Sequence, residues 1–293
     1  PDVISLSNGL LLGLCPVIER DLGIPVVVSL QGEDAFLDTL VEPYCEQSWT
    51  AMRANARHVT QFIAASDYYG GTMSQRLDVP REKVSVIFNG LDVTSFAAAK
   101  PDPNWPTIGF FARMIHGKGL TTLVDAFIEL ARRGTVPRVK LKLGGSTTPA
   151  DEKYLAGLRR KLAEAGLAER VEWHPNLSFS DKIKFFRDLT VFSVPATYGE
   201  AFGLYVIEAI ASGVPVVQPN HAAFPELIQA TGGGVLCEPD DVKALADALE
   251  GLLQDGQLRE KLITTGMARV RSEFTAVRMA EKFEQVLLAA RQH

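Results

Sequence analysis

The sequence predicts an open α/β protein of two domains, each built from parallel strands joined by crossover helices. Short β-rich apolar runs alternate with segments of helical period, which is the pattern of repeated βαβ units. At about 100 to 200 residues per domain, a chain of 293 residues has room for two domains. With 46% apolar residues, each of them can bury a core.

The N-terminal part of the chain supplies the first series of elements. Strands are expected at 3–6, 25–30, 61–65 and 83–88, and helices at 10–22, 42–58 and 67–77. Ser66 directly precedes the helix at 67–77. We predict it as the N-cap, because a serine oxygen accepts hydrogen bonds from the free N–H groups of a first helical turn.

A proline-rich stretch separates this series from the next one. Residues 96–106 (FAAAKPDPNWP) carry three prolines and show no apolar period, which is typical of an interdomain linker. The strands that follow are expected at 107–111, 139–143, 171–173, 191–194 and 214–218, with a turn at 232–234 leading into a short strand at 235–236. The helices are expected at 120–133, 151–165, 181–187, 204–211, 241–253, 257–271 and 276–291.

We therefore predict an N-terminal domain at 1–103 and a C-terminal domain at 104–275. Because open α/β sheets bind ligands at the carboxyl ends of their strands, the ligand is expected between the two domains. The terminal segment 276–293 has the length to pack back on the N-terminal domain. That domain has few expected strands, so we expect its opening strands to be absent and one sheet edge to be unpaired.

Composition excludes two classes of partner. A formal net charge of −5 does not fit a nucleic-acid binder, which needs a concentrated basic surface. No run approaches the roughly 18 uninterrupted apolar residues of a transmembrane helix. The cysteines Cys15, Cys45 and Cys237 are odd in number and form no C-x-x-C pair, which predicts free thiols and a cytoplasmic protein.

The most informative run is 195–219 (PATYGEAFGLYVIEAIASGVPVVQP). A strand ends near its start, a polar turn carries Glu200, Gly203 opens a helix, and Glu208 lies on that helix. A helix that begins at the carboxyl end of a strand points free N–H groups and a positive dipole end into the cleft, which suits a phosphate. The two carboxylates lie at most about 12 Å apart if the span is helical. One acid at each end of a diphosphate could accept hydrogen bonds from sugar hydroxyls.

Two cations follow the strand at 107–111. Arg113 and Lys118 lie in the turn before the next helix, where positive charge is disfavoured by the helix dipole unless an anion binds there. At this place they could neutralise a departing diphosphate. The chain contains no Asp-x-Asp, so a metal-dependent reaction is the weaker alternative and no metal is expected. The P-loop pattern is also missing around residues 117–119.

At these residues the sequence resembles the large retaining glycosyltransferase family of the GT-B fold, which includes sucrose synthases and many bacterial sugar transferases. The resemblance is carried by four stretches in order: 85–96 (SVIFNGLDVTSF), 108–127 (IGFFARMIHGKGLTTLVDAF), 141–145 (LKLGG), and the Glu-x7-Glu run 200–208 with the following GVPVV and Pro-Glu. It spans the chain from the first residue to about 291, in register with the latter three quarters of a family member.

The resemblance implies two Rossmann-like domains and a nucleotide-diphospho-sugar donor, with transfer of the sugar at retained anomeric configuration. By position, Arg113 and Lys118 would bind the diphosphate, Glu208 the ribose hydroxyls, and Glu200 the transferred sugar. The backbone of Phe202, Gly203 and Leu204 would receive phosphate or sugar oxygens, and Gly145 would line the donor site. The acceptor would be a small molecule, a glycan or a lipid-linked sugar.

The chain also departs from the family pattern. Family members commonly have a histidine in place of Ser7 and another in place of Gln31, and a Gly-Gly where this chain has residues 221–224 (HAAF). Gln31 can exchange hydrogen bonds but cannot be a titratable acid or base. The added side chains at 221–224 should narrow the pocket or change which sugar hydroxyls are contacted. Two alternatives stay open: a module that binds the nucleotide sugar without transferring it, and, ranked lower, a GT-B-like epimerase or phosphorylase.

Overall fold

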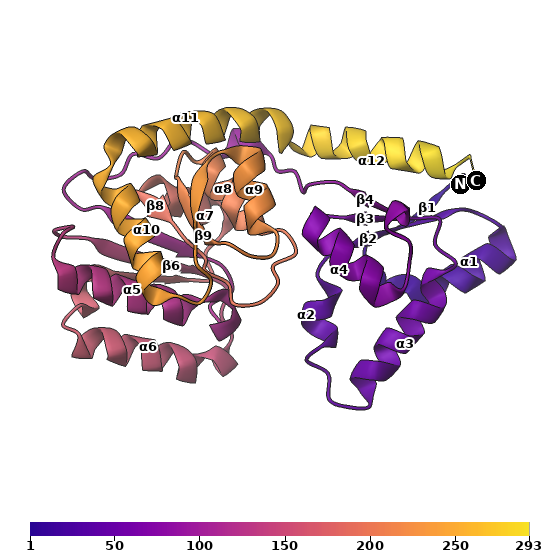
Figure 1. Cartoon of the computed structure of the whole chain (residues 1–293), viewed down its shortest axis with the longest axis horizontal. Coiled ribbons are helices and arrows are strands. Elements are labelled where there is room, and N and C mark those ends of the chain that lie inside the picture. Colours follow the sequence, from indigo (N-terminus) through magenta and orange to yellow (C-terminus); the bar gives the residue numbers. More distant parts are fainter. Residues whose placement is uncertain (293) are drawn as a thin grey trace. The chain divides into compact units, whose positions relative to one another are not determined.

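The computed structural model describes residues 1–292, and the terminal residue of the segment predicted at 276–293 lies outside this range. The chain divides into two compact units (Figure 1). The first unit comprises Pro1–Gly90, Glu200–Phe202 and the segment from Phe274 onward. The second comprises Leu91–Gly199 and Gly203–Glu273.

The first unit is built on a parallel sheet of four strands in the order β1-β2-β3-β4. The strands are β1 (Ile4–Leu6), β2 (Val26–Leu30), β3 (Gln61–Ala64) and β4 (Val84–Val86). The helices are α1 (Cys15–Leu22), α2 (Glu33–Leu37), α3 (Tyr44–Ala56), α4 (Asp67–Leu77) and α12 (Ala276–Ala290). All the strands predicted for this part of the sequence are present, whereas the short helix α2 was not predicted.

Both faces of the first sheet are covered to different extents. On one face, strand residues such as Val28 and Phe62 pack with Trp49 of α3 and Met73 of α4 in one buried cluster. On the other face, Val27, Ile63 and Ile87 pack against α12 (yellow in Figure 1). The apolar side chains that α12 contributes are Met279, Phe283, Val286, Leu287 and Ala290. The terminal helix is thus part of the core of the first unit.

The second unit holds a parallel sheet of six strands in the order β10-β9-β8-β5-β6-β7. The strands are β5 (Thr107–Phe111), β6 (Lys140–Gly145), β7 (Val171–Pro175), β8 (Val191–Phe192), β9 (Val216–Pro219) and β10 (Gly234–Cys237). The helices are α5 (Leu120–Arg133), α6 (Glu152–Glu164), α7 (Phe179–Arg187), α8 (Leu204–Ala211), α9 (Phe224–Thr231), α10 (Val242–Gln254) and α11 (Gly256–Glu273).

The order of this sheet has a switch point between β5 and β8. From β5 the chain builds outward through β6 and β7, and it then returns to add β8, β9 and β10 on the other side. In open α/β sheets, the crevice outside the carboxyl ends of the strands at such a reversal is the usual ligand site. The strand order therefore directs attention to the loops that follow β5, β6 and β8.

Two segments differ from the prediction. Residues 96–106, predicted as a linker, belong to the second unit: Ala99 N–H donates to Ser212 O and Lys100 N–H to Arg187 O, both at 2.7 Å. The contact-based division accordingly falls between Gly90 and Leu91, ahead of the predicted boundary at 103/104. The helix α9 (Phe224–Thr231) forms where no helix or strand was predicted. Pro225 is compatible with its first turn, because the N–H that proline lacks would have no partner within the helix there.

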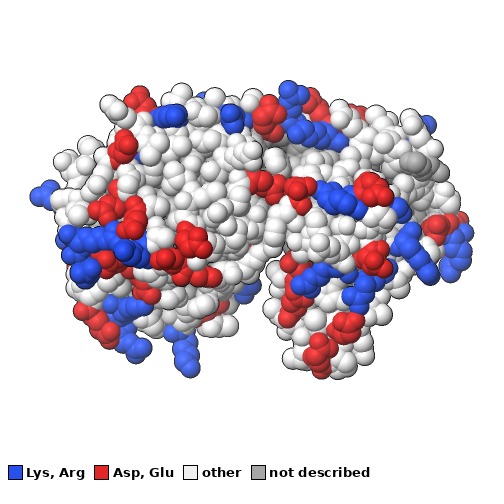
Figure 2. Space-filling model, in the orientation of Figure 1, with Lys and Arg blue, Asp and Glu red and all other residues white. Residues whose placement is uncertain are grey.

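Charge on the face shown in Figure 2 is mixed. Acidic and basic side chains alternate over both units on that face, with no broad field of one sign. Single-sign fields steer charged partners toward a surface, so this face offers little of that kind of steering.

Candidate functional site

A cavity of about 630 Å³ lies in the second unit, at the carboxyl ends of β5, β6 and β7. The start of α8 closes it on another side. It is lined by Phe111, Ala112, Arg113, Gly145, Ser146, Asn176, Leu177, Ser178, Phe179, Lys182, Leu204, Tyr205 and Glu208. It adjoins the switch point between β5 and β8, since its lining includes the loop after β5 and the helix α8 that follows β8.

The cavity brings together half of the residues predicted as site residues. Arg113 follows β5, Gly145 ends β6, and Leu204 and Glu208 lie on α8. They meet because parallel strands present their carboxyl ends, and the loops that leave them, at one edge of the sheet. The remaining predicted residues, Glu200, Phe202, Gly203 and Lys118, are not part of its lining.

Two glycines shape the cavity through their backbone. Gly145 has a φ of 136°, and a Cβ at this position would overlap the carbonyl oxygen of Ala112. A side chain here would push apart the ends of β5 and β6. Gly203 is the N-cap of α8 with a φ of 89°, a conformation that glycine adopts without strain. The first N–H groups of α8 have no partner within the helix and lie beside the cavity, which favours an anion.

Glu208 is the buried acid of the site. It is 6% exposed, and its Oε1 lies 2.6 Å from Nζ of Lys182. Burial raises the pKa of the Glu208 carboxyl, while the hydrogen bond and charge of Lys182 oppose that rise. The lysine therefore stabilises an ionised carboxylate that desolvation would otherwise disfavour.

Lys182 was missed in the sequence analysis. It lies near the start of α7, and its ammonium group also stands 5.3 Å from the ring centroid of Phe179 and 5.8 Å from that of Phe111. The criterion that singled out Lys118, a cation where the helix dipole disfavours it, applies equally to Lys182. No motif surrounds it, so its partner Glu208, 26 positions away, was not apparent from the sequence.

Lys118 lies among aromatic rings next to the cavity. Its Nζ is 4.8 Å from the ring centroid of Tyr198 and 5.4 Å from that of Tyr205, which lines the cavity. Arg113 is exposed and lines the cavity directly. Both predicted cations are therefore associated with the second unit, Arg113 in the cavity wall and Lys118 behind Tyr205.

Glu200 and Phe202 lie outside the cavity of the second unit. The segment Glu200–Phe202 groups with the first unit. There the Phe202 ring is buried at 6.0 Å from Phe88, and the carbonyl oxygen of Ala201 accepts a hydrogen bond from Ser66 Oγ at 2.6 Å. Glu200 is half-buried. The predicted pair of acids thus belongs to two units, and only Glu208 lines the cavity of the second.

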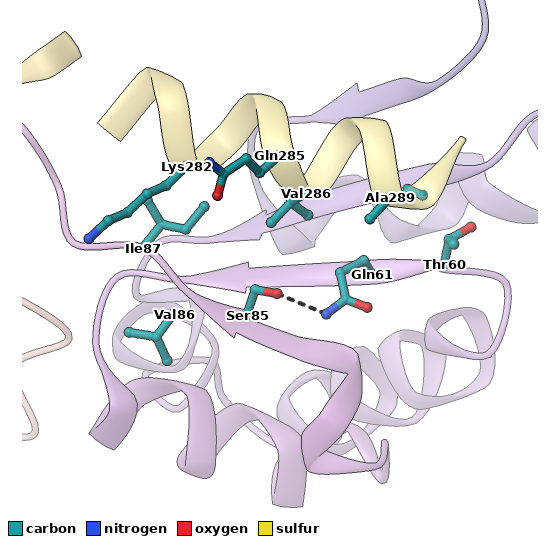
Figure 3. A pocket seen from close by; sticks show the side chains of 10 residues that line it. Thr60, Gln61, Ser85, Val86, Ile87, Lys282, Gln285, Val286 and Ala289 are labelled. Atoms are coloured by element: carbon teal, nitrogen blue, oxygen red, sulfur yellow. Dashed lines mark hydrogen bonds between the residues drawn. The ribbon is translucent and has the colours of Figure 1, made fainter. Parts of the chain in front are cut away.

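A second cavity, of about 580 Å³, lies in the first unit between α12 and the strands β3 and β4 (Figure 3). On its sheet side Gln61 Nε2 donates to Ser85 Oγ at 3.0 Å, and on its helix side lie Lys282 and Gln285. Its lining contains no carboxylate, and it reaches Thr60 and Gln61 at the amino end of β3. It extends from there to Val86 and Ile87 at the carboxyl end of β4, so it lies under α12 along the face of the sheet, unlike the cavity of the second unit.

Two histidines of the second unit have structural partners. His221 Nε2 lies 2.8 Å from the carbonyl oxygen of Ala196, and the His174 ring packs edge-on against Phe185. Within residues 1–292, no three side chains of the His, Cys, Asp or Glu type are grouped so that they could hold a metal ion.

None of the helices in the same range combines the length and apolar character needed to cross a bilayer.

The parallel sheets, the switch point and the cavity beside a helix start define an α/β protein of the nucleotide-binding type. Comparison with known proteins gives the family. Residues 94–269 match the family described as "Glycosyl transferases group 1", and the chain belongs to this family. The match confirms the predicted glycosyltransferase class.

Curated relatives agree with this assignment. The lipopolysaccharide core biosynthesis mannosyltransferase LpsB of Rhizobium meliloti is 32% identical over 235 residues, covering 74% of this chain and 62% of the relative. A phosphatidyl-myo-inositol mannosyltransferase of Mycobacterium tuberculosis is 33% identical over 193 residues, covering 62% of this chain and 48% of the relative. The chain thus spans between about half and three fifths of the length of these two proteins.

Solved structures show the same fold. Alr3699/HepE of Anabaena, in complex with UDP, superposes with a TM-score of 0.84 at 21% identity, covering 98% of this chain and 79% of that one. Sucrose-phosphate synthase of Thermosynechococcus elongatus gives a TM-score of 0.82 at 21% identity, covering 97% and 72%. These similarities confirm the predicted α/β fold of GT-B type.

The pairing of Lys182 with Glu208 predicts a pH-dependent loss of stability. Lys182→Met should lower the free energy of unfolding by about 1–3 kcal/mol at pH 7, because it leaves a buried carboxylate without its cation. The raised pKa of Glu208 rises further in this variant. The loss should therefore be complete above that pKa and disappear as the pH falls below it, where the carboxyl is protonated.

Chemical denaturation at pH 7 and pH 4 measures this effect. Lys184→Met is the matched control, since Lys184 is an exposed residue of the same helix that pairs with Asp181. The double variant Lys182→Met/Glu208→Gln should recover part of the lost stability. Equal losses in Lys182→Met and Lys184→Met would contradict the assignment.

Proposed function

We propose that this chain catalyses transfer of a hexose from a nucleotide-diphospho-sugar to an acceptor, with retention of the anomeric configuration. The observation that carries the proposal is the cavity at the strands' carboxyl ends, where the start of α8, the cation Arg113 and the buried Glu208–Lys182 pair face one space. An anion-favouring helix start beside a desolvated acceptor of hydroxyl hydrogen bonds fits a nucleoside diphosphate.

Each side chain has a proposed role. Glu208, kept ionised by Lys182, accepts hydrogen bonds from the ribose hydroxyls. Arg113 and Lys118 stabilise the charge on the diphosphate as it departs. Glu200 binds the transferred sugar, and the backbone at Phe202–Leu204 receives sugar or phosphate oxygens.

In the proposed reaction, the bond between the anomeric carbon and the diphosphate oxygen breaks, and the acceptor oxygen bonds to the same face of the sugar. The departing phosphate oxygen takes the acceptor's proton, so no covalent enzyme nucleophile is needed. Catalysis then rests on stabilising the leaving group and holding the acceptor on the same face of the sugar as the departing diphosphate.

Relatives suggest the first donors and acceptors to test. Several are named as mannosyltransferases, and one, from Xanthomonas oryzae, is named as acting between GDP-mannose and a cellobiosyl-diphosphopolyprenol. We therefore propose GDP-mannose as the first candidate donor and a lipid-linked or lipopolysaccharide saccharide as the acceptor. UDP-glucose is the second candidate, because it is bound in a HepE structure of similar fold.

A module that binds the donor without transferring it is the second candidate function. It is favoured by the place of Glu200, the acid proposed to contact the sugar, which is not part of the lining of the cavity that holds Glu208. Calorimetry with nucleotide sugars, combined with an assay for sugar transfer by this chain, separates the two. Binding with turnover supports the transferase, and tight binding without turnover supports the module.

Replacement of Glu200 tests the role of the sugar-contacting acid. Glu200→Ala should abolish transfer and weaken binding of the nucleotide sugar, while affinity for the nucleoside diphosphate alone stays within about twofold, since Glu200 has no proposed contact with the nucleotide. Titration calorimetry with GDP-mannose and GDP, and with UDP-glucose and UDP, measures both affinities. Unchanged turnover in this variant would remove the assignment.

Replacement of the cations tests leaving-group stabilisation. Arg113→Met and Lys118→Met should each raise the barrier to transfer by about 2.7–4 kcal/mol if each acts like one oxyanion-hole donor, a rate loss of about 100- to 1000-fold. Single-turnover measurement of sugar release from the donor reports the loss.

Lys140→Met is the matched control for these variants. Lys140 also stands over an aromatic ring, with its Nζ 4.8 Å from the centroid of Trp105, but it begins β6 at the opposite end of the strand from Gly145. It should keep the rate of the unaltered protein. Normal rates in both Arg113→Met and Lys118→Met would contradict the phosphate role.

A further inference from the structure

The hydroxyl group of Ser66 makes two hydrogen bonds in the first unit. Its oxygen accepts from the N–H of Tyr69 at 3.0 Å, which confirms its predicted role as N-cap of α4. Its own hydrogen is donated to the carbonyl oxygen of Ala201 at 2.6 Å. Ser66 is fully buried, and a hydroxyl has only one hydrogen to give, so its single donation is committed to the segment Glu200–Phe202.

Apolar contacts hold the same segment. Ala201 packs against the buried cluster of the first unit, and a Cβ placed on Gly32 would lie 4.0 Å from its Cβ. Phe202 is 3% exposed with its ring 6.0 Å from that of Phe88. The Phe88 ring is in turn stacked on Phe274 at 5.4 Å, with an angle of 4° between the rings. Ala201 and Phe202 are therefore held in two ways, by the hydrogen bond to the Ala201 carbonyl and by the packing of their side chains.

The loop after β2, which includes Gly32 next to Ala201, is itself held by the buried carboxylate of Glu33. Glu33 is 2% exposed, and its oxygens accept the N–H groups of Gly9 at 2.7 Å, Gln31 at 2.9 Å and Gly32 at 3.1 Å. The hydroxyl of Tyr69 donates to the same carboxylate at 2.8 Å. Ser66 is the N-cap of α4, and Tyr69 lies in the first turn of that helix. The start of α4 therefore holds both the loop after β2 and the segment Glu200–Phe202 by hydrogen bonds.

We propose that Ser66 is a positioning residue for Glu200. Residues 193–203, between β8 and α8, form no helix or strand, so Glu200 is not placed by a regular element. A side chain that recognises a sugar must be held to within about 0.5 Å by its supporting contacts. The Ser66 hydroxyl and the Phe88 ring supply that support at the two residues after Glu200. This inference rests on the proposed contact of Glu200 with the transferred sugar.

The test is the preference for a nucleotide sugar over its nucleoside diphosphate. Calorimetry measures it as a ratio, the dissociation constant of the diphosphate divided by that of the nucleotide sugar, for GDP with GDP-mannose and for UDP with UDP-glucose. Ser66→Ala should lower this ratio by about three- to tenfold, the value of one lost hydrogen bond. Affinity for the diphosphate alone should stay within about twofold. Ser66→Thr, which keeps the hydroxyl, should restore most of the preference.

Two further variants separate positioning from general stability. Thr275→Ala removes an N-cap from α12 in the same unit without touching Glu200–Phe202, so it should lower the melting temperature but leave the preference intact. Phe88→Leu keeps both caps but loosens the contact with Phe202, so it should lower the preference even if Ser66→Ala fails to fold. An equal loss of preference in Thr275→Ala would overturn the positioning role.

Glu200→Ala distinguishes failure of this inference from failure of the proposed function. If Glu200→Ala loses the preference while Ser66→Ala and Phe88→Leu keep it, the positioning role is wrong and the role of Glu200 stands. If Glu200→Ala keeps the preference, its proposed contact with the sugar is wrong and the inference falls with it. If the unaltered protein binds none of the four ligands, the proposed donor site is wrong and the inference is overturned too.

Discussion

The parallel direction of every strand is the constraint on which the rest of the structure depends. Within residues 1–292 both sheets are parallel throughout, so all carboxyl ends of a sheet lie at one edge, and the loops that leave them meet there. Strand interiors are buried on both faces and tolerate few polar groups. The loops and helix starts at this edge are therefore where Arg113, Gly145 and Glu208 come together without disturbing the core.

Burial of Glu208 places an ionised carboxylate in a largely water-free part of the cavity of the second unit. A carboxylate removed from water is costly unless a cation is close, and Lys182 meets this requirement from the neighbouring helix α7. A desolvated, ionised acceptor binds neutral hydroxyls more strongly than a solvated one, because water no longer competes for its oxygens. The same burial that raises the pKa of Glu208 is therefore compatible with its proposed contact with ribose hydroxyls.

The sequence predicted what local pattern determines and missed what depends on contacts between distant residues. The strands and the cap at Ser66 follow from periodicity and side-chain chemistry, and both are present. The donation from Ser66 to Ala201 joins residues 135 positions apart, and no local pattern encodes it. Residues 96–106 read as a linker because prolines and polar residues dominate there, yet Phe96 is buried against Phe179 and Phe186. This aromatic contact and the backbone hydrogen bonds of Ala99 and Lys100 attach the segment to the second unit.

The two acids of the Glu-x7-Glu run, Glu200 and Glu208, lie in different environments and do not share one face of a helix. The estimate of about 12 Å assumed a helical span, but α8 begins only at Leu204, so Glu200 precedes the helix and Glu208 lies within it. Glu208 is buried beside a cation, whereas Glu200 is half-buried on a segment held by Ser66 and Phe202. Two carboxylates in unlike surroundings can serve unlike roles. The run places a loop acid, a helix-opening glycine and a helix acid in that order, and of the three only Gly203 has a positive φ, which lets the chain turn from the loop into the helix.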